Sequence, residues 1–314
     1  MDYRPQLLLA GAFAAVVVAV FAAAAVEIVR VLLERFAGAA PPGPRRRLYR
    51  RAVLGAAALG VLCIAWGYFV EPRWPEVTRV RIDSPKVRPG ARPVRIVHVS
   101  DLHVEGKPRL EERLPDLVAA EKPDFIVFTG DALNSPAGLT RFRATMAALA
   151  RIAPTFGVRG NWDVWYWNHL DLFGGTGAVE VDRNPVRLVV AGTPVRIAGC
   201  NYDAAPDLDR EIRGADPAEL LLFLYHTPDV AYLLAERRVD LALAGHTHGG
   251  QVALPWFGAI ITFSKFGRRF ARGLHEVDGM RLYVNRGLGM EGRNAPRVRF
   301  CARPEITVLE IAPK

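Results

Sequence analysis

The sequence of 314 residues is poor in cysteine. It contains three, of which Cys63 lies inside an apolar run while Cys200 and Cys301 stand alone. Isolated cysteines form neither a zinc knuckle nor a disulfide framework, so small domains stabilised by zinc or by several disulfides are excluded. A single Cys200–Cys301 bridge is left open. The chain also lacks internal repeats, and its only biased tracts are Ala-rich apolar stretches.

Excess charge is missing from most of the chain as well. Residues 96–314 contain 26 Lys and Arg and 26 Asp and Glu, whereas residues 1–95 contain 15 against 6. A nucleic-acid-binding domain needs a basic surface to neutralise phosphates, so the balanced part argues against nucleic acid as a partner. The basic residues of the first part flank apolar segments, where they favour contact with anionic membrane lipids.

Two long uncharged runs account for the high apolar content of 51%. Residues 7–26 and 52–70 carry no charged side chain, and each run is long enough to cross about 30 Å of hydrocarbon as a helix. A signal peptide is the alternative for the first run, but its apolar core is too long and a second run follows. The pattern predicts a membrane anchor over residues 1–70, with transmembrane helices at 7–26 and 52–70.

Arginines between the two runs predict the orientation of this anchor. Seven arginines and two glutamates lie there, against one arginine and one aspartate before residue 7. Positively charged flanks stay on the cytoplasmic side of a membrane, so the connecting loop is expected in the cytoplasm. The chain after Val70 is then predicted on the outer side.

After the anchor, the sequence repeats one arrangement of apolar strands and polar loops. Residues 71–93 are rich in Pro and Arg and predict a linker with an edge strand at 77–82, and residues 94–314 predict the main domain. In that domain apolar strands end in polar loops, and helix-spaced apolar residues at 109–121 and 139–152 separate the first strands. Alternating strands and helices predict an α/β fold whose polar groups converge at the carboxyl ends of strands.

Ligand-type side chains stand at five of these strand ends. The last of them is a Gly-flanked turn, residues 244–251, which presents two histidines because glycine frees the backbone. The seven candidate metal ligands are Asp101, His103, Asp131, Asn161, His226, His246 and His248. Oxygen and imidazole donors in this number suit two divalent ions, and Mn, Fe and Zn all fit because no thiolate selects among them.

The ordered blocks Asp-Xaa-His, Gly-Asp, Gly-Asn-Xaa-Asp, His and Gly-His-Xaa-His resemble the calcineurin-like metallophosphoesterase family, and within it the membrane-associated or exported bacterial branch. The resemblance implies two mixed β-sheets packed as a sandwich flanked by helices. It also implies that a hydroxide bridging the two ions attacks phosphorus. The implied ligand sets are Asp101, His103 and His248 for one ion, Asn161, His226 and His246 for the other, and Asp131 between them.

Trp162 departs from the family pattern. Most members carry His at this place in the Gly-Asn-Xaa-Asp block, where it assists the leaving group, and indole cannot transfer a proton. Three readings stay open: His169 or Arg159 takes over the role, the leaving group needs no acid, or catalysis is weak. For His169 the alternative is an ordinary surface histidine. Loss of a general acid costs about 10²–10⁴-fold. Asp163, which ends the block, is expected to hold a ligand or an arginine rather than to bind a metal.

The segment after the histidine turn predicts a substrate surface. Residues 255–263 are largely apolar, and residues 265–303 contain ten basic side chains against three acidic ones. An apolar lip beside a basic rim suits a lipid with a phosphate headgroup. The candidate substrate-binding residues are Arg159, Arg268, Arg269 and Arg272. The alternative is a hydrophobic strand pair that closes the second sheet.

These features predict a two-pass protein of the bacterial inner membrane whose outward-facing domain is a metal-dependent phosphoric ester hydrolase. The expected substrate is a phosphomonoester or phosphodiester, carried by a lipid or a nucleotide-activated glycolipid. A metal-binding membrane sensor or scaffold with weak catalysis is the rival hypothesis, supported by Trp162 alone. The sequence predicts no oligomeric state. The residues expected to act in catalysis are Asp131, Asn161, His226 and His169.

Overall fold

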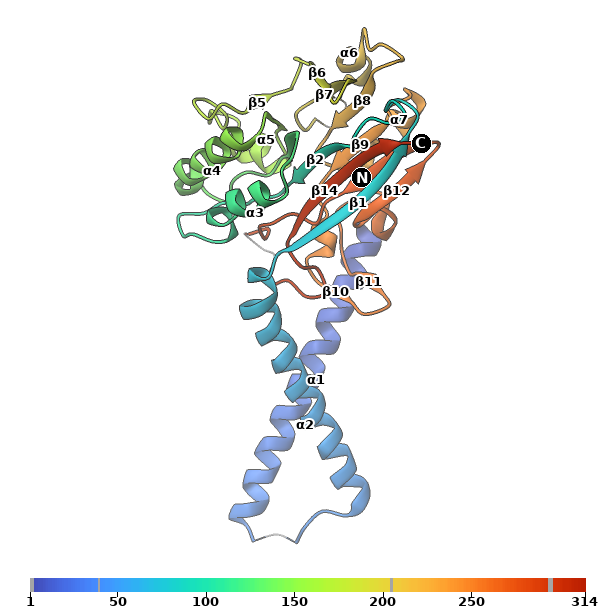
Figure 1. Ribbon diagram of the computed structural model, residues 1–314. Helices are drawn as coiled ribbons and strands as arrows, with labels where there is room; N and C mark the ends of the chain where they lie inside the picture. The colour runs from blue at the N-terminus through green and yellow to red at the C-terminus, as the bar shows by residue number, and fades with distance from the viewer. Residues whose placement is uncertain (1–2, 39, 204–205, 293–295) are drawn as a thin grey trace.

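The computed structural model describes residues 3–38, 40–203, 206–292 and 296–314. A hairpin of two N-terminal helices projects from a mixed α/β domain (Figure 1). Both helices are long and apolar enough to cross a membrane. The hairpin consists of α1, Arg4–Phe36, and α2, Pro44–Ala65, with the short turns η1, Trp66–Val70, and η2, Glu71–Arg73, at its end.

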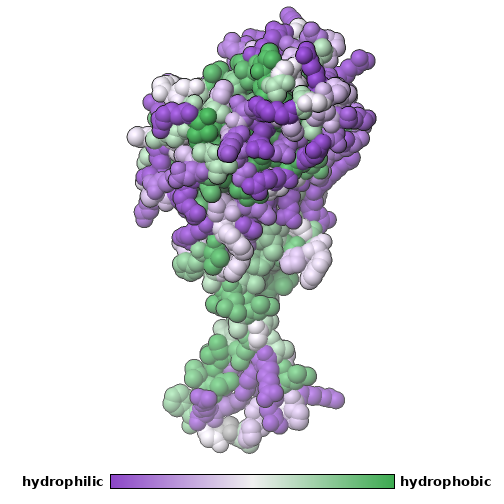
Figure 2. All heavy atoms as spheres, in the orientation of Figure 1, coloured by the Kyte–Doolittle hydropathy of each residue, from purple (hydrophilic) through white to green (hydrophobic). Residues whose placement is uncertain are grey.

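The hairpin exposes its apolar side chains. Leu8 of α1 and Leu62 of α2 are 74% and 66% exposed. Figure 2 shows an apolar band along this stalk, with hydrophilic side chains at its loop end and over the domain at the other end. At the loop end Arg50 pairs with Glu27 at 3.2 Å and with Glu34 at 2.8 Å. An apolar surface of this extent, bounded by charge on both sides, fits a lipid environment.

The domain is built on two six-stranded mixed sheets. The first has the order β1-β14-β2-β3-β4-β5, and its strands are Glu76–Ser84, Glu305–Pro313, Val94–Val99, Phe125–Thr129, Thr155–Val158 and Val179–Glu180. The second has the order β12-β13-β9-β8-β7-β6, and its strands are Gly273–Val277, Met280–Val284, Leu241–Ala244, Leu220–Leu224, Thr193–Gly199 and Val186–Val190.

The two sheets pack face to face because their central strands are apolar on both sides. β3 and β8 are buried along their whole length, and Phe125 and Val127 share a core with Leu222 and Leu243. This layering confirms the predicted sandwich. Helices cover the outer faces: α3, Leu114–Ala120, and α4, Leu139–Ile152, on the first sheet, and α6, Leu208–Ile212, and α7, Ala231–Glu236, on the second.

Several details differ from the sequence-based expectations. The predicted helix at 109–121 is a 3-10 turn, Leu110–Glu112, followed by α3, whose second residue is a proline that suits only a first helical turn. The strands β10, Ala253–Leu254, and β11, Gly258–Ala259, pair only with each other. A strand pair that closes the second sheet is therefore wrong for this segment. The disulfide left open by the sequence is also wrong, because Cys200 and Cys301 are both free.

Both membrane-type helices are hydrogen-bonded to the domain. In the first turn of α1, the Gln6 amide donates to the Ser264 carbonyl at 2.8 Å and accepts from the Thr262 N–H at 2.8 Å. Beyond α2, the buried Glu71 carboxylate accepts from the backbone N–H groups of Cys301 at 3.0 Å and Ala302 at 2.6 Å. The domain therefore holds the near end of each helix in a defined place.

Candidate metal centre

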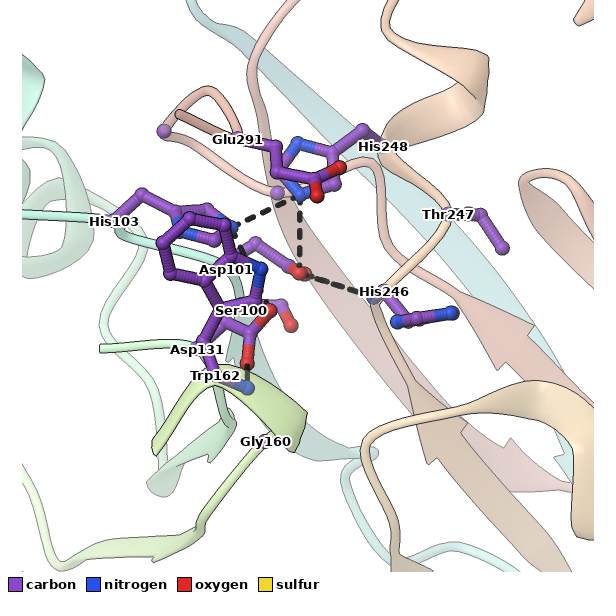
Figure 3. Close-up of polar contacts among 12 residues, drawn as sticks. Ser100, Asp101, His103, Asp131, Gly160, Trp162, His246, Thr247, His248 and Glu291 are labelled. Atoms are coloured by element: carbon purple, nitrogen blue, oxygen red, sulfur yellow. Dashed lines mark hydrogen bonds and ion pairs between the residues drawn. The ribbon is translucent and has the colours of Figure 1, made fainter. Parts of the chain in front are cut away.

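The seven ligand-type residues lie at the carboxyl ends of five strands. Neighbouring parallel strands end at the same edge of a sheet, and the two packed sheets bring both edges together (Figure 3). All seven are buried except His246, which is partly exposed. The positions are Asp101 and His103 after β2, Asp131 after β3, Asn161 at the start of α5 (Asn161–Trp167) after β4, His226 after β8, and His246 and His248 after β9.

Five of these residues have a left-handed backbone. The φ angles are 50° at Asp101, 44° at His103, 57° at Asp131, 70° at His246 and 51° at His248. Such a conformation is unfavourable for residues other than glycine and persists only where the surrounding structure enforces it, as it does at functional sites. Between the last two ligands, the Thr247 hydroxyl turns away and donates to the Ala271 carbonyl at 2.7 Å (Figure 3).

Two glycines let the loops approach the carboxylates. A Cβ atom added at Gly245 would lie 2.0 Å from Ser100 Oγ and 2.2 Å from Asp101 Oδ2. A Cβ atom at Gly160 would lie 2.1 Å from Asp131 Oδ1. No side chain fits at such distances, so the backbone of each loop packs directly against a ligand.

Asp101, His103 and His248 form one candidate ligand group. The Nε2 atoms of His103 and His248 face each other at 3.2 Å, and His248 Nε2 lies 3.3 Å from Asp101 Oδ1 (Figure 3). Because imidazole nitrogens bind divalent ions at about 2.0–2.1 Å, two nitrogens about 3 Å apart can share one ion. The spacing of this group therefore fits a divalent metal.

Asp101, Asp131 and His226 form a second candidate group. His226 Nε2 lies 3.3 Å from Asp131 Oδ2 and 4.0 Å from Asp101 Oδ1. The other ring nitrogen, Nδ1, contacts the Thr129 carbonyl at 2.6 Å and so carries the proton. His226 Nε2 is buried and has no hydrogen-bond partner among the described residues. A buried ring nitrogen aimed at two carboxylates fits a metal ligand.

His246 and Asn161 stand beside the second group. His246 Nε2 contacts the Phe263 carbonyl at 3.1 Å and therefore carries the proton, which leaves a lone pair on Nδ1. This Nδ1 atom lies 2.9 Å from Asn161 Oδ1. Two acceptor atoms this close repel each other unless a cation lies beside both. The rings of His246 and His226 are 5.1 Å apart, so the structure brings all the predicted ligands together.

Asp131 reaches both groups. Its Oδ2 atom lies 3.6 Å from His103 Nε2 and 3.3 Å from His226 Nε2. Its Oδ1 atom accepts a hydrogen bond from the Trp162 backbone N–H at 2.9 Å, which fixes the carboxylate (Figure 3). One oxygen is thus held by the protein while the other faces both sets of imidazoles. This is the geometry that a carboxylate shared between two ions needs.

Burial and the charges of neighbouring groups together set the pKa values of the centre. Burial alone would raise the pKa of Asp101, but His248, His226 and His103 hold it well below its usual range. Burial lowers the pKa of His103 to about 4. At His226 burial also opposes the charged form, yet the adjacent Asp131 carboxylate outweighs it and raises the pKa to about 9. The centre therefore has a strong negative potential that attracts cations.

Asp163 holds the ligand loops, as expected from the sequence. Its carboxylate accepts hydrogen bonds from the backbone N–H groups of Asp131, Ala132 and Gly160, each at 2.9 Å. Burial and the nearby Asp131 charge raise its pKa to about 7 against these three donors. The bonds tie the loop after β3 to the loop after β4, so Asp163 positions Asp131 without itself reaching the ligand groups.

Trp162 occupies the place where most family members carry His. Its indole is buried and packs edge-on against the His103 ring at 5.3 Å. Close by, the Glu291 carboxyl lies next to His248 (Figure 3). Burial raises the pKa of Glu291, while the His248 imidazole lowers it. The sequence pattern missed Glu291, whose one signal is that it interrupts a basic stretch.

Arg159 and His169 do not join the ligands. The buried Arg159 guanidinium donates to Glu180 Oε1 at 2.8 Å and to the Leu170 carbonyl at 3.0 Å. His169 is exposed, two residues beyond α5. Within the described part of the chain, no hydrogen bond or ion pair joins either side chain to a ligand-type residue. Their roles in substrate binding and proton transfer stay predictions.

The predicted basic rim packs against aromatic rings. Arg268 lies over the Phe257 ring at 4.1 Å and Arg269 over the Tyr232 ring at 5.5 Å. Arg272 donates to a backbone carbonyl at 3.0 Å. These arginines are not among the residues that line the cavity beside His246 and His248, and their contact with substrate also stays a prediction.

Arg299 is a second residue that sequence reasoning missed. It is fully buried and donates to the carbonyls of Ala302 at 2.8 Å and Gly289 at 3.0 Å. Its Nη2 atom lies 3.3 Å from His248 Nδ1, directly behind the metal-facing side of that ring. Its own backbone N–H donates to the Gly67 carbonyl in η1 at 2.9 Å. Nothing in the sequence separates it from the exposed arginines around it.

Comparison with known proteins agrees with this centre. A family model described as calcineurin-like phosphoesterase matches residues 94–250. The uncharacterised metallophosphoesterase YkuE of Bacillus subtilis is 32% identical, with 85% of this chain and 97% of YkuE covered. Phosphodiesterase YaeI of Escherichia coli is 29% identical, with 83% and 98% covered. The UDP-2,3-diacylglucosamine pyrophosphatase LpxG of Chlamydia trachomatis is 26% identical, with 80% and 94% covered.

The family model spans the strands that carry five of the ligands and the turn that carries the other two, and the relatives are similar over nearly their whole lengths. The family uses divalent metals, and the buried carboxylate and imidazole groups are suited to hold them. The chain therefore belongs to the calcineurin-like metallophosphoesterases and is a phosphoester hydrolase.

Proposed function

We propose that this protein hydrolyses a phosphoester carried by a membrane lipid, with two divalent ions held between the two sheets. The observation that carries the proposal is the pair of ligand groups that share Asp101 and face Asp131, with the buried His226 Nε2 between the two carboxylates. One ion would be held by Asp101, His103 and His248, and the other by Asn161, His226 and His246, with Asp131 shared. Mn, Fe and Zn all suit this donor set.

When bound, two such ions would clamp a phosphate, neutralise its charge and lower the pKa of an attacking water. The protein's own part is to hold the ligands rigidly. Asp163 fixes the Asp131 loop, the Thr129 and Phe263 carbonyls orient His226 and His246, and left-handed backbone angles set the turns. Because nothing needs to reorganise, the full electrostatic effect is available to the transition state.

A lipid-linked substrate is supported by the surroundings of the centre. The membrane-type hairpin is hydrogen-bonded to the same segments that surround the ligands. The strands β10 and β11 lie close to the hairpin (Figure 1), and between them Trp256 is fully exposed and Phe257 is exposed. Tryptophan is enriched at membrane–water interfaces. Among the relatives, LpxG is named for a pyrophosphatase reaction on a diacylated, nucleotide-linked sugar.

We further propose the topology that the sequence predicts. Residues 1–70 would anchor the protein in the bacterial inner membrane, residues 71–93 would lead out of it, and residues 94–314 would form the hydrolase domain on the outer side. The hairpin geometry supports a two-pass anchor, because the start of α1 and the end of α2 both contact the domain. The arginines that flank the connecting loop belong to the last turns of α1 and the first turns of α2, at the end of the hairpin far from the domain (Figure 1), which supports a cytoplasmic place for this loop.

A metal-binding sensor with little turnover is the second candidate, favoured by one observation. Trp162 fills the place of the usual proton donor and packs on His103. Loss of a general acid slows an ester hydrolysis by about 10²–10⁴-fold, which could leave binding as the main activity. The complete and rigid ligand set favours the enzyme.

The deciding experiment is hydrolysis by the full chain in detergent, stripped of metal and reloaded with Mn or Zn. A chromogenic phosphodiester, a chromogenic phosphomonoester and an acylated phosphodiester serve as substrates. We expect metal-dependent turnover that falls by more than about 10³-fold in Asp131→Asn, beyond the 10–100-fold that a supporting group costs. Trp162→His is the companion variant. It should raise the rate on poor leaving groups only.

The outcomes separate the two candidates. Turnover that disappears in Asp131→Asn, together with loss of bound metal by elemental analysis, supports the hydrolase. Two bound ions per chain without turnover on any substrate, even in Trp162→His, would move the assignment to the sensor. Equal rates on the acylated and soluble diesters would argue against the lipid.

A further inference from the structure

A cavity of about 440 Å³ lies between α1 and the metal centre. One wall is the membrane-type helix itself, through Ala10, Phe13, Ala14 and Val17, which share one helix face at the spacing i, i+3, i+4, i+7. The opposite wall comes from the domain and includes Ile260 and Ile261. Its volume lies in the range of sites for small ligands.

The cavity changes character along its length. At the domain end it reaches His246 and His248 of the metal centre, with Gln251 and Glu291 beside them. Toward the hairpin the lining is apolar, and it continues onto the exposed apolar surface of α1, where Val18 is 66% exposed. From Ala10 to Val18 this wall runs roughly 12 Å along the helix at 1.5 Å per residue. Such a gradient suits an amphiphile with its phosphate at the histidines and its tail along α1.

The position of α1 against the domain is fixed by contacts with Thr262 and Phe263, two residues that line the cavity. Gln6 bonds to Thr262 and Ser264 on either side of Phe263, and the Tyr3 ring packs edge-on against Phe263 at 6.0 Å. The Phe263 carbonyl in turn orients His246. A helix that served only as a membrane anchor would not need a fixed position relative to a metal ligand.

We propose that α1 is a wall of the substrate site and that this cavity, the α1 groove, seats an acyl chain of the lipid substrate, which enters sideways from the bilayer. The inference rests on the proposed hydrolysis of a lipid-linked phosphoester. The bilayer is as apolar as the groove, so a chain gains little free energy by entering it. The groove therefore selects the substrate by its shape, not by tight binding of the tail, and places the phosphate at the metals.

The first test is photochemical and does not depend on turnover. The full chain is placed in phosphatidylethanolamine vesicles doped with phosphatidic acid that carries a diazirine in the middle of one acyl chain. Adducts on α1 alone would form with any surrounding lipid. The informative adducts are those on Val252, Ile260 and Ile261, because these residues belong to the domain and line the groove.

Ala14→Trp fills the groove, and Ala12→Trp is its matched control. Ala12 is two residues away, about 200° around the helix, is exposed and is not among the groove residues. We expect domain adducts in the unaltered protein and in Ala12→Trp and their loss in Ala14→Trp. Their absence from residues 252–261 in the unaltered protein, or their persistence in Ala14→Trp, would overturn the inference. The groove would then belong to another occupant, such as a second copy of the chain.

The second test uses kinetics. The ratio of kcat/KM for the acylated diester to that for the soluble diester should fall at least about tenfold in Ala14→Trp relative to Ala12→Trp, since a change of pocket shape is worth that much in discrimination. An unchanged ratio would overturn the inference. Absence of turnover on every substrate would instead count against the proposed function, and the adducts would still decide whether an acyl chain occupies the groove.

Discussion

In the metal centre several ligands are held by directed contacts with backbone groups, whereas the α1 wall of the groove beside it consists of apolar side chains. Asp131 and His246 are each fixed through one atom by a backbone group and turn the other atom toward other ligand-type residues. On the α1 side of the cavity, Ala10 and Ala14 contribute only apolar surface. The two regions meet at His246 and His248, which belong to both.

This contrast follows from what each region has to do. Attack on phosphorus requires fixed distances, because a misplacement of about 1 Å can cost 10²-fold in rate. Accommodation of a flexible chain requires space and low polarity instead. A substitution should therefore have a large effect at the centre and a small, substrate-dependent effect on the α1 side.

Gly245→Ala should give the largest effect among the residues that bind no metal. The new Cβ would lie 2.0 Å from Ser100 Oγ and 2.2 Å from Asp101 Oδ2, so the turn or the carboxylate has to move. A displacement of about 1 Å predicts a loss of about 10²-fold in kcat on every substrate. Gly106→Ala is the control, because its Cβ would make only an ordinary contact with Ala137. Equal rates in the two variants would show that the centre tolerates movement.

Asp163→Asn should have a somewhat smaller effect. An amide in place of the carboxylate turns an N–H₂ group toward backbone donors of Asp131, Ala132 or Gly160, one of which loses its partner. We expect kcat to fall about 10–100-fold, the usual cost of losing support for a ligand. Metal content measured at saturating Mn should stay near that of the unaltered protein. Loss of both ions would mean that Asp163 is itself a ligand.

Metal affinity should rise with pH. His226 holds a proton in the metal-free protein, since Asp131 raises its pKa to about 9 although burial opposes the charged form. A metal has to displace that proton, so affinity should increase roughly tenfold per pH unit below about pH 9. Titration calorimetry in buffers of different ionisation enthalpy should detect about one proton released for this ligand. Affinity that is independent of pH would show that His226 is neutral or is not a ligand.

Much of the centre could be predicted from the sequence because each ligand follows an apolar strand. Parallel strands of one sheet carry their carboxyl ends to one edge, and the packing of the two sheets brings the two edges together. Asp131 after β3 and His226 after β8 therefore meet although 95 residues separate them. The α/β fold could be predicted from the alternation of strands and helices in the sequence. Arg299 could not be predicted, because burial of one arginine depends on carbonyls from distant turns.

The groove could not be predicted for a related reason. In the sequence α1 is an anchor that ends well before the domain begins, and its alanines carry no signal of a binding surface. Its place beside His246 depends on the docking of the hairpin. The apolar lip predicted at residues 255–263 overlaps the observed groove, since Ile260 and Ile261 line it. Of the arginines after it, Arg268 and Arg269 lie over the aromatic rings of Phe257 and Tyr232 instead.

Gln6→Leu should have the smallest effect and the most selective one. The substitution removes the amide that joins α1 to the backbone of Thr262 and Ser264, and a hydrogen bond of this kind is worth about 1 kcal/mol. If that energy holds the α1 wall in register with the centre, the ratio of kcat/KM for the acylated to the soluble diester should fall about fivefold. Leu8→Met, at a side chain that is 74% exposed, is the control and should leave the ratio unchanged. An equal loss on both diesters in Gln6→Leu would show that the helix acts through His246 and the metals, and the two regions would then be one mechanical unit.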